Sequence, residues 1–290
     1  MNIAPDLVTL AHQFLQENNL PAATTCLQAA LSENPSNLEA HNLREHYQLT
    51  GALGSAFNMN AVISPDDDIF RFFANHPSSL HPIRDYLADG WRTLAELTQL
   101  LARLERNLHT CSHFLEFACG FGRFTRHLVS ALPTNTLHVS DVVPGSVDFL
   151  RSQFNVSGFY SSTDPATVSF PPQQHYDIIF VLSLFSHLPD STWQAWLTRL
   201  FSVVKPGGVL IITTHGEKCA TQAGVTLTDG YAFFPDSESH ALSHDVYGCT
   251  FTTPEYVDRT ISTLAERRSV HHFPAHFWGN QDAYAISRRT

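Results

Sequence analysis

The sequence predicts an α/β protein with a doubly wound, mainly parallel sheet and an N-terminal helical extension. Three observations support this prediction. From Phe114 onward, short apolar segments alternate with amphipathic segments, as in strands that are separated by helices. The first apolar segment runs into a turn of small residues, Ala118 to Gly122, directly before a helical pattern. Near the start of the chain, apolar side chains instead recur every three or four positions, which is typical of helices alone.

Seven strands are expected in the later part of the chain. Their predicted ranges are 113–118, 136–141, 157–161, 176–182, 208–214, 269–277 and 283–287. The intervening helices are expected to start near Gly122, Pro144 and Ser191. Parallel strands joined by helices place those helices on both faces of a sheet. The two late strands are expected to extend the sheet at its edge, one of them antiparallel.

Residues 1–50 are predicted to form a helical segment of three helices, the third from about Asn37 to Leu49. The apolar faces of the first two consist of Leu7, Leu10, Ala11, Phe14, Ala23, Leu27 and Ala30. With Pro35 ending the second helix, this segment resembles a single tetratricopeptide repeat. One repeat cannot bury a solenoid core, so the resemblance implies docking on a protein partner or in a homodimer. An amphipathic helical hairpin without a binding role explains the same pattern.

Residues 51–110 are expected to form a linker followed by a helical cap. Glycine, asparagine and serine residues favour a linker at 51–65, and leucine spacing predicts a long helix from about 92 to 107. Between them, Asp66–Asp68 precede an apolar segment. We interpret these carboxylates as a helix start, where they complement the dipole, rather than as a metal site. The remaining residues, 111–290, would form the ligand-binding domain.

Composition excludes several classes of function. The formal net charge of −10 argues against nucleic acid as a partner. No apolar run approaches the ~20 residues that span a bilayer, so no membrane association is expected. The five cysteines form no paired motif, and His271, His272 and His276 do not converge in a strand, so no metal is expected. The chain's start lacks signal-peptide features, and we expect a cytoplasmic location.

The turn after the first predicted strand favours a nucleotide-like ligand. Small side chains at Ala118, Gly120 and Gly122 let the backbone approach a ligand closely, and Glu116 lies at the strand end. Asp141 ends the second predicted strand about 20 residues later, the spacing at which an acid reaches ribose hydroxyls. Capping of the helix near Pro144 is the alternative role for Asp141.

Four motifs in order make the chain resemble a class I S-adenosylmethionine-dependent methyltransferase. Glu116–Gly122 is similar to the family's first motif, with Ala118 in place of the usual first glycine, and Asp141 is similar to its ribose-binding acid. Tyr176–Ser183 and Lys205–Ile212 resemble its fourth strand and its Pro-Gly-Gly turn into the fifth. The resemblance covers about residues 80–290. It implies a Rossmann-like methyltransferase fold over 111–290 and S-adenosyl-L-methionine as cofactor.

The resemblance also implies the cofactor contacts. The loop would pass under the methionine part, Glu116 would face its amino group, and Asp141 would hold the ribose. The implied cofactor-binding residues are Tyr86, Arg92, Glu116, Ala118, Cys119, Gly120, Gly122, Asp141, Val142, Ser162, Thr163, Leu182 and Ser183. Arg92 is equally explained as an exposed helix cation.

His187 and His215 are the candidate catalytic residues. Each follows a predicted parallel strand at its carboxyl end, where ligands bind in such sheets, and an imidazole can titrate near neutral pH. A structural, hydrogen-bonded role is the alternative for both. The aromatic segments Tyr231–Phe234 and Trp278–Gln281 either roof the acceptor pocket or pack in the core.

The expected function is methyl transfer to oxygen or nitrogen of a small-molecule acceptor, such as a sugar or natural-product intermediate. The alternatives are a methyltransferase acting on a peptide or protein, and an interaction protein whose methyltransferase-like domain is regulatory or inactive. A nicotinamide-dependent oxidoreductase is disfavoured because the GxGxxG fingerprint is absent.

Overall fold

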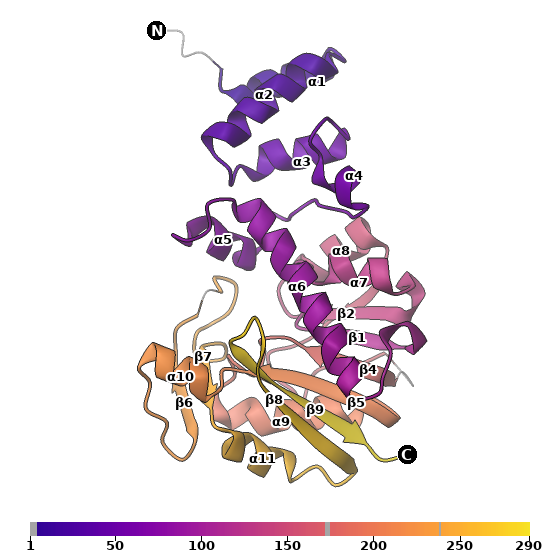
Figure 1. Ribbon diagram of the computed structural model, residues 1–290, viewed down its shortest axis with the longest axis vertical. Helices are drawn as coiled ribbons and strands as arrows, with labels where there is room; N and C mark the ends of the chain where they lie inside the picture. The colour runs from indigo at the N-terminus through magenta and orange to yellow at the C-terminus, as the bar shows by residue number, and fades with distance from the viewer. Residues whose placement is uncertain (1–4, 172–174, 238) are drawn as a thin grey trace. The chain divides into compact units, whose positions relative to one another are not determined.

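The computed structural model describes residues 5–171, 175–237 and 239–290. The chain divides into two compact units, Met1–Gly90 and Trp91–Thr290, and helix α6 (Pro82–Arg103) begins in the first and ends in the second (Figure 1). This helix starts ten residues before the expected one, because Pro82 provides a favourable first helical position. Within the described ranges, no helix is long and apolar enough to cross a membrane.

The first unit is helical. Its helices before α6 are α1 (Leu7–Gln16), α2 (Leu20–Glu33), α3 (Leu38–His46), α4 (Leu53–Phe57) and α5 (Asp68–Asn75). The short helix α4 lies inside the segment expected to be a linker. Ala11, Ala23 and Leu27 are fully buried between the first two helices, as the spacing of apolar residues predicts. The tetratricopeptide resemblance itself remains a prediction.

The three aspartates before α5 act as expected of a helix start. Asp67 Oδ1 accepts hydrogen bonds from the backbone N–H of Ile69 and Phe70 at 2.9 and 3.1 Å. Asp68 opens the helix and pairs with Arg71. Asp67 therefore satisfies backbone donors that the first turn of a helix leaves unpaired.

The second unit contains a seven-stranded sheet in the order β3-β2-β1-β4-β5-β9-β8. Its strands are β1 (Phe114–Phe117), β2 (Leu137–Asp141), β3 (Ser157–Tyr160), β4 (Tyr176–Val181), β5 (Val204–Thr214), β8 (Arg267–Phe277) and β9 (Gln281–Arg288). Strands β1 to β5 are parallel, whereas β9 runs antiparallel to both β5 and β8. This confirms the predicted doubly wound α/β fold.

The position of β9 corrects the prediction that both late strands lie at the edge. Strand β9 is inserted between β5 and β8, so of the two late strands only β8 lies at an edge of the sheet. Residues 281–287 are all buried, so both faces of β9 are covered. A strand buried in this way needs a neighbour on each side to satisfy its backbone groups, and β5 and β8 supply these neighbours.

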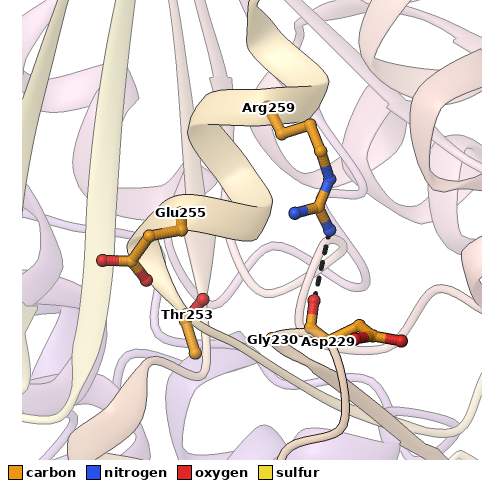
Figure 2. Close-up of a pocket in the computed structure, with 5 residues that line it drawn as sticks. All are labelled: Asp229, Gly230, Thr253, Glu255 and Arg259. Atoms are coloured by element: carbon orange, nitrogen blue, oxygen red, sulfur yellow. Dashed lines mark hydrogen bonds between the residues drawn. The ribbon is translucent and has the colours of Figure 1, made fainter.

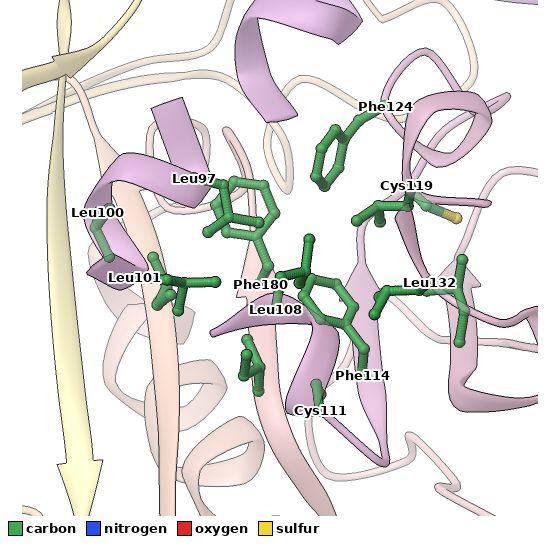
Figure 3. Close-up of a cluster of buried hydrophobic side chains, with 14 of the residues drawn as sticks. Leu97, Leu100, Leu101, Leu108, Cys111, Phe114, Cys119, Phe124, Leu132 and Phe180 are labelled. Atoms are coloured by element: carbon green, nitrogen blue, oxygen red, sulfur yellow. The ribbon is translucent and has the colours of Figure 1, made fainter. Parts of the chain in front are cut away.

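Two hydrophobic cores cover the two faces of the sheet. On one face, the end of α6, α7 (Thr125–Ala131) and α8 (Ser146–Phe154) pack over β1 and β4, where Leu97, Phe114 and Phe180 are fully buried (Figure 3). On the other face, α9 (Asp190–Ser202) and α11 (Pro254–Ile261) contribute Trp193 and Val257. The helices expected near Gly122, Pro144 and Ser191 thus begin within three residues of these positions.

A segment between β5 and α11 forms a small additional sheet that the sequence did not predict. After α10 (Glu217–Ala223), strands β6 (Tyr231–Phe234) and β7 (Cys249–Thr252) pair antiparallel. Main-chain bonds attach this sheet to the loops after β4 and β5: Thr250 N–H donates to Ser186 O at 2.7 Å, and Thr252 N–H to His215 O at 2.9 Å. The sequence pattern marked Tyr231–Phe234 only as an aromatic segment that roofs the pocket or packs, because a strand of four residues has too short a pattern to be recognised.

Candidate functional site

The loop after β1 has an unusual backbone. Ala118, Gly120 and Gly122 all have positive φ angles, of 61°, 54° and 84°. The N–H groups of Ala118 and Cys119 both donate to Ser140 O on β2, at 2.8 and 3.2 Å, and hold the loop against the sheet. A non-glycine residue in this region costs about 1–2 kcal/mol, so Ala118 carries strain where the resembled motif has glycine. The loop is therefore held in a fixed, strained shape.

The two glycines of the loop differ in their surroundings. A Cβ atom at Gly120 would meet no heavy atom within 4 Å. A Cβ atom at Gly122 would collide with Leu150 Cδ2 and lie 3.2 Å from Phe154 Cε2, both on α8. Gly122 therefore permits close helix packing, whereas Gly120 leaves the backbone open to a ligand.

Asp141 lies directly beside this loop. Its side chain is buried at the carboxyl end of β2, where Oδ2 accepts from Gly120 N–H at 2.7 Å and Oδ1 accepts from Val143 N–H at 2.8 Å. The structure thus brings together the predicted acid and the predicted loop, and the half-buried Val142 lies between Asp141 and its second donor.

Glu116 is buried in β1, and its Oε2 accepts a hydrogen bond from the Thr125 hydroxyl at 2.7 Å. Burial raises the pKa of Glu116 to about 8. The carboxyl group is therefore mostly protonated at neutral pH, and a ligand ammonium beside it would favour its ionised form.

The remaining predicted cofactor contacts occupy varied surroundings. Cys119 is buried, and burial together with Asp141 and Glu116 raises the pKa of its thiol well above the ordinary value. It therefore serves as a small neutral side chain. The Ser162 hydroxyl accepts from Asp164 N–H at 3.1 Å in the turn after β3, and the next residue, Thr163, is exposed.

Arg92 pairs with Glu96 on α6, with Nε 2.8 Å from Oε1. The Glu96 carboxylate also accepts from Trp278 N–H, at 3.1 and 2.9 Å, and the Arg123 guanidinium lies 5.0 Å from the Trp278 ring centre. Two arginines therefore flank the β8–β9 turn. In the helical unit, Tyr86 is fully buried and its hydroxyl donates to Asp67 Oδ2 at 2.5 Å.

Polar side chains meet at the carboxyl ends of β4 and β5. Leu182 and Ser183 follow β4, and both are half-buried. Ser183 has a positive φ of 59°, and its N–H donates to Thr213 Oγ1 at 2.8 Å. Its hydroxyl lies 2.9 Å from Nε2 of Gln281, which also lies 3.3 Å from His215 Nε2.

Sequence reasoning treated Gln281 only as part of an aromatic segment that roofs or packs. The available signal was the polar pair Gln281 and Asp282 directly before the apolar segment 283–286. Because β9 is antiparallel, with Asp282 in register with Thr214, its first residue lies at the edge where β5 ends. The position of Gln281 follows from that topology, which the sequence pattern alone did not establish.

The two candidate histidines are close to each other. Their ring centres are 5.7 Å apart, and the His187 ring stacks on Tyr247 at 4.4 Å. His187 Nδ1 is 2.5 Å from Gly248 O, and His215 Nδ1 is 3.2 Å from Thr250 O. A carbonyl oxygen only accepts, so Nδ1 carries the hydrogen in both rings. Burial, then the neighbouring His187, lowers the pKa of His215 to about 4.

A separate pocket of about 520 Å³ opens at the start of α11 (Figure 2). It is lined by Asp229, Gly230, Thr253, Glu255 and Arg259, and Arg259 Nη2 donates to Asp229 O at 3.2 Å. It contains none of the predicted site residues. The pocket is wide open, and its charged side chains of both signs do not converge on a point, so it does not define a binding site.

Comparison with known proteins identifies the region that contains the loop. Residues 115–210 match the model of a family described as a methyltransferase domain. The chain contains a methyltransferase domain. The match runs from β1 into β5 and includes the loop, Asp141, Ser183 and His187. His215 and Gln281 lie outside the matched segment.

Relatives and solved structures agree with this assignment. The chain is 23% identical over 162 residues to a malonyl-[acyl-carrier protein] O-methyltransferase of Porphyromonas gingivalis, covering 56% of this chain and 60% of the relative. It is 26% identical over 156 residues to alpha N-terminal protein methyltransferase 1 of Arabidopsis thaliana, covering 50% of this chain and 51% of the relative. The chain thus spans little more than half the length of these two curated relatives.

The fold of the methyltransferase domain is also found in a solved S-adenosylmethionine-dependent methyltransferase from Clostridium acetobutylicum. The two structures align with a TM-score of 0.50 and 11% identity, covering 70% of this chain and 93% of the other. At this identity the similarity concerns the fold.

Proposed function

We propose that this protein is an S-adenosylmethionine-dependent methyltransferase that methylates oxygen or nitrogen of a small-molecule acceptor. The observation that carries the proposal is the hydrogen bond from the Gly120 N–H to the Asp141 carboxylate inside the methyltransferase domain. This bond places a fixed carboxylate beside an open backbone loop at the carboxyl ends of two parallel strands. This is where ligands bind in such sheets.

The residues present fit this cofactor. A Cβ at Gly120 would project into open space, and the Ser140 hydroxyl beside Asp141 is buried without a hydrogen-bond partner. In this proposal Asp141 holds the ribose hydroxyls, the loop supports the methionine part of the cofactor, and the protonatable Glu116 faces the methionine amino group. Arg92 would contact the methionine carboxylate, and Ser162 and Thr163 would border the adenine.

When bound, the cofactor supplies an activated sulfonium methyl group that an acceptor lone pair can attack. The protein's contribution is then to align the acceptor and exclude water. Ser183, His187 and His215 lie together where an acceptor could be oriented. His215 is neutral at pH 7, because its pKa lies near 4. It can therefore accept a hydrogen bond from an acceptor but is a weak base.

Titration calorimetry on the full chain tests the proposal. We expect micromolar binding of S-adenosylmethionine or S-adenosylhomocysteine and none of NAD. Replacing Asp141 with Ala should weaken binding at least tenfold, whereas Asp258→Ala, an exposed change on α11, should leave it unchanged. Wild-type protein that binds neither sulfur compound would refute the proposal.

An acceptor carried on a protein is the second candidate. The two curated relatives are named for an acyl-carrier-protein substrate and for protein N-termini. The helical unit would then recognise that protein. Incubation of the full chain with radiolabelled cofactor and fractionated cell extract separates the two, since label would enter either the small-molecule or the protein fraction. A truncation after residue 50 is unsuitable, because His41 bonds Ala61 O at 2.7 Å and the cut would divide the unit.

A further inference from the structure

Gln281 links the ends of three strands. It is the first residue of β9 and is only 4% exposed. Its amide nitrogen lies 2.9 Å from Ser183 Oγ, after β4, and 3.3 Å from His215 Nε2, after β5. A buried amide has two N–H donors, and here each has an acceptor within reach.

The direction of the bond to His215 follows from the other side of the ring. Nδ1 faces the carbonyl oxygen of Thr250 at 3.2 Å, so Nδ1 carries the hydrogen and Nε2 presents a lone pair. An amide oxygen facing that lone pair would repel it. The amide nitrogen of Gln281 must therefore face the ring, which excludes the flipped orientation of the side chain.

The groups around His215 favour a neutral ring. They are the His187 ring, the Phe251 ring at 5.4 Å and the Cys249 sulfur, which lies 3.8 Å from Nδ1. Gln281 and Ser183 add only neutral hydrogen-bonding groups. The Thr250 carbonyl favours a positive charge on the ring, but burial and the His187 ring outweigh it and lower the pKa of His215.

We propose that Gln281 is a positioning residue that locks His215 as the neutral Nδ1–H form and keeps Nε2 turned toward the end of β4. A base oriented by a third group is a common arrangement in catalysis. The inference rests on the proposed methyltransferase function and restricts the chemical class of its acceptor. The Nε2 lone pair selects an uncharged acceptor with an O–H or N–H that replaces the Gln281 N–H, rather than a carboxylate.

Nitrogen-15 NMR of the full chain with labelled histidine tests this role without a known acceptor. The chain has 17 histidines, so the His215 signal is identified by its loss in His215→Asn. In the wild type we expect a protonated Nδ1 and an unprotonated Nε2 that do not titrate between pH 5 and 8. Gln281→Leu and the shorter Gln281→Asn remove the bond at Nε2 and leave the Thr250 carbonyl, 3.2 Å from Nδ1, to favour the Nδ1–H form, so both should show an added fraction of the other neutral form.

Gln281→Glu should have the opposite effect on charge. A carboxylate beside Nε2 would stabilise the protonated ring and raise its titration midpoint by about 1–3 pH units. Gln194→Glu, the same change at an exposed position on α9, should leave the His215 signal unchanged. Circular dichroism establishes that each variant is folded.

Unchanged His215 signals in Gln281→Leu and Gln281→Asn, or an unmoved midpoint in Gln281→Glu, would overturn the positioning role. The preference for an uncharged acceptor is tested by measuring S-adenosylhomocysteine formation with matched hydroxyl, amine and carboxylate compounds as methyl acceptors. Faster turnover of the carboxylate would overturn that preference. Calorimetry with S-adenosylhomocysteine judges the methyltransferase proposal separately, since cofactor binding does not depend on the tautomer of His215.

Discussion

Two single variants, Gly120→Ala and Gly122→Ala, should separate the contribution of the loop to helix packing from its contribution to ligand binding. Gly120 and Gly122 are two residues apart and both have positive φ angles, of 54° and 84°. They differ in what an added methyl group would meet. At Gly122 it collides with Leu150 and approaches Phe154, whereas at Gly120 it meets nothing within 4 Å.

The expected magnitudes follow from these surroundings. A left-handed alanine costs about 1–2 kcal/mol of folding stability at either position. Overpacking against α8 adds about 1–3 kcal/mol at Gly122 alone. Gly122→Ala should therefore lower the free energy of unfolding by about 2–5 kcal/mol, and Gly120→Ala by about 1–2 kcal/mol. For cofactor affinity we expect the reverse order, because only the Gly120 methyl group fills space that is open to a ligand.

Urea unfolding followed by tryptophan fluorescence measures the first effect. All four tryptophans lie in the unit Trp91–Thr290, so the signal reports on the methyltransferase domain rather than on the helical unit. Calorimetry with S-adenosylhomocysteine measures the second effect. Equal stability losses in the two variants would refute the packing argument. Unchanged affinity in Gly120→Ala would refute the open-backbone argument.

Four further results are expected. Glu116 has a pKa of about 8 in the free protein, and a ligand ammonium beside it would ionise it, so binding of S-adenosylhomocysteine at pH 7 should release nearly one proton. Calorimetry should show this release as a binding enthalpy that depends on the buffer. An enthalpy that is the same in all buffers would contradict a contact between Glu116 and the ligand ammonium. Because the pKa of Glu116 is raised from 4.5 to about 8 in the folded protein, the free energy of unfolding should fall as the pH rises through this range. Glu116→Gln removes this loss and should therefore be more stable than the wild type at pH 9 but not at pH 4. Urea midpoints equal to those of the wild type at both pH values would contradict this expectation. Asp141→Asn should weaken binding and speed amide exchange at Gly120, whose N–H it holds, with wild-type exchange as the contrary outcome. Glu96→Ala should speed amide exchange at Trp278, and slow exchange there would show that the turn is held by other contacts.

The parallel half of the fold could be predicted because each of its elements has a local signal. Strands β1, β2 and β4 are short apolar runs, and Gly122 and Pro144 precede their helices. The order of the last two strands has no such signal, since apolar strands look alike whether they lie inside a sheet or at its edge. The small β6–β7 sheet escaped prediction because its strands are held by bonds to distant loops rather than by their own pattern.

The same distinction applies to the candidate site. Asp141 and the loop could be predicted as neighbours, because spacing along the chain and parallel topology bring strand ends together. The partners of His215 could not, since Thr250 and Gln281 come from the inserted sheet and from an antiparallel strand far along the chain. The roles assigned to the individual residues remain predictions.

The way the inserted sheet is attached has a consequence for how acceptor preference could diverge. Its main-chain links to Ser186, His187 and His215 are supplemented by the hydroxyls of Tyr231 and Thr250, which both donate to Leu188 O, at 3.0 and 2.6 Å. Exposed side chains, such as Phe234 on β6, make none of these bonds and can be exchanged while the sheet stays attached. Such an attachment allows new specificities to arise by point mutation, without rebuilding the cofactor half of the enzyme.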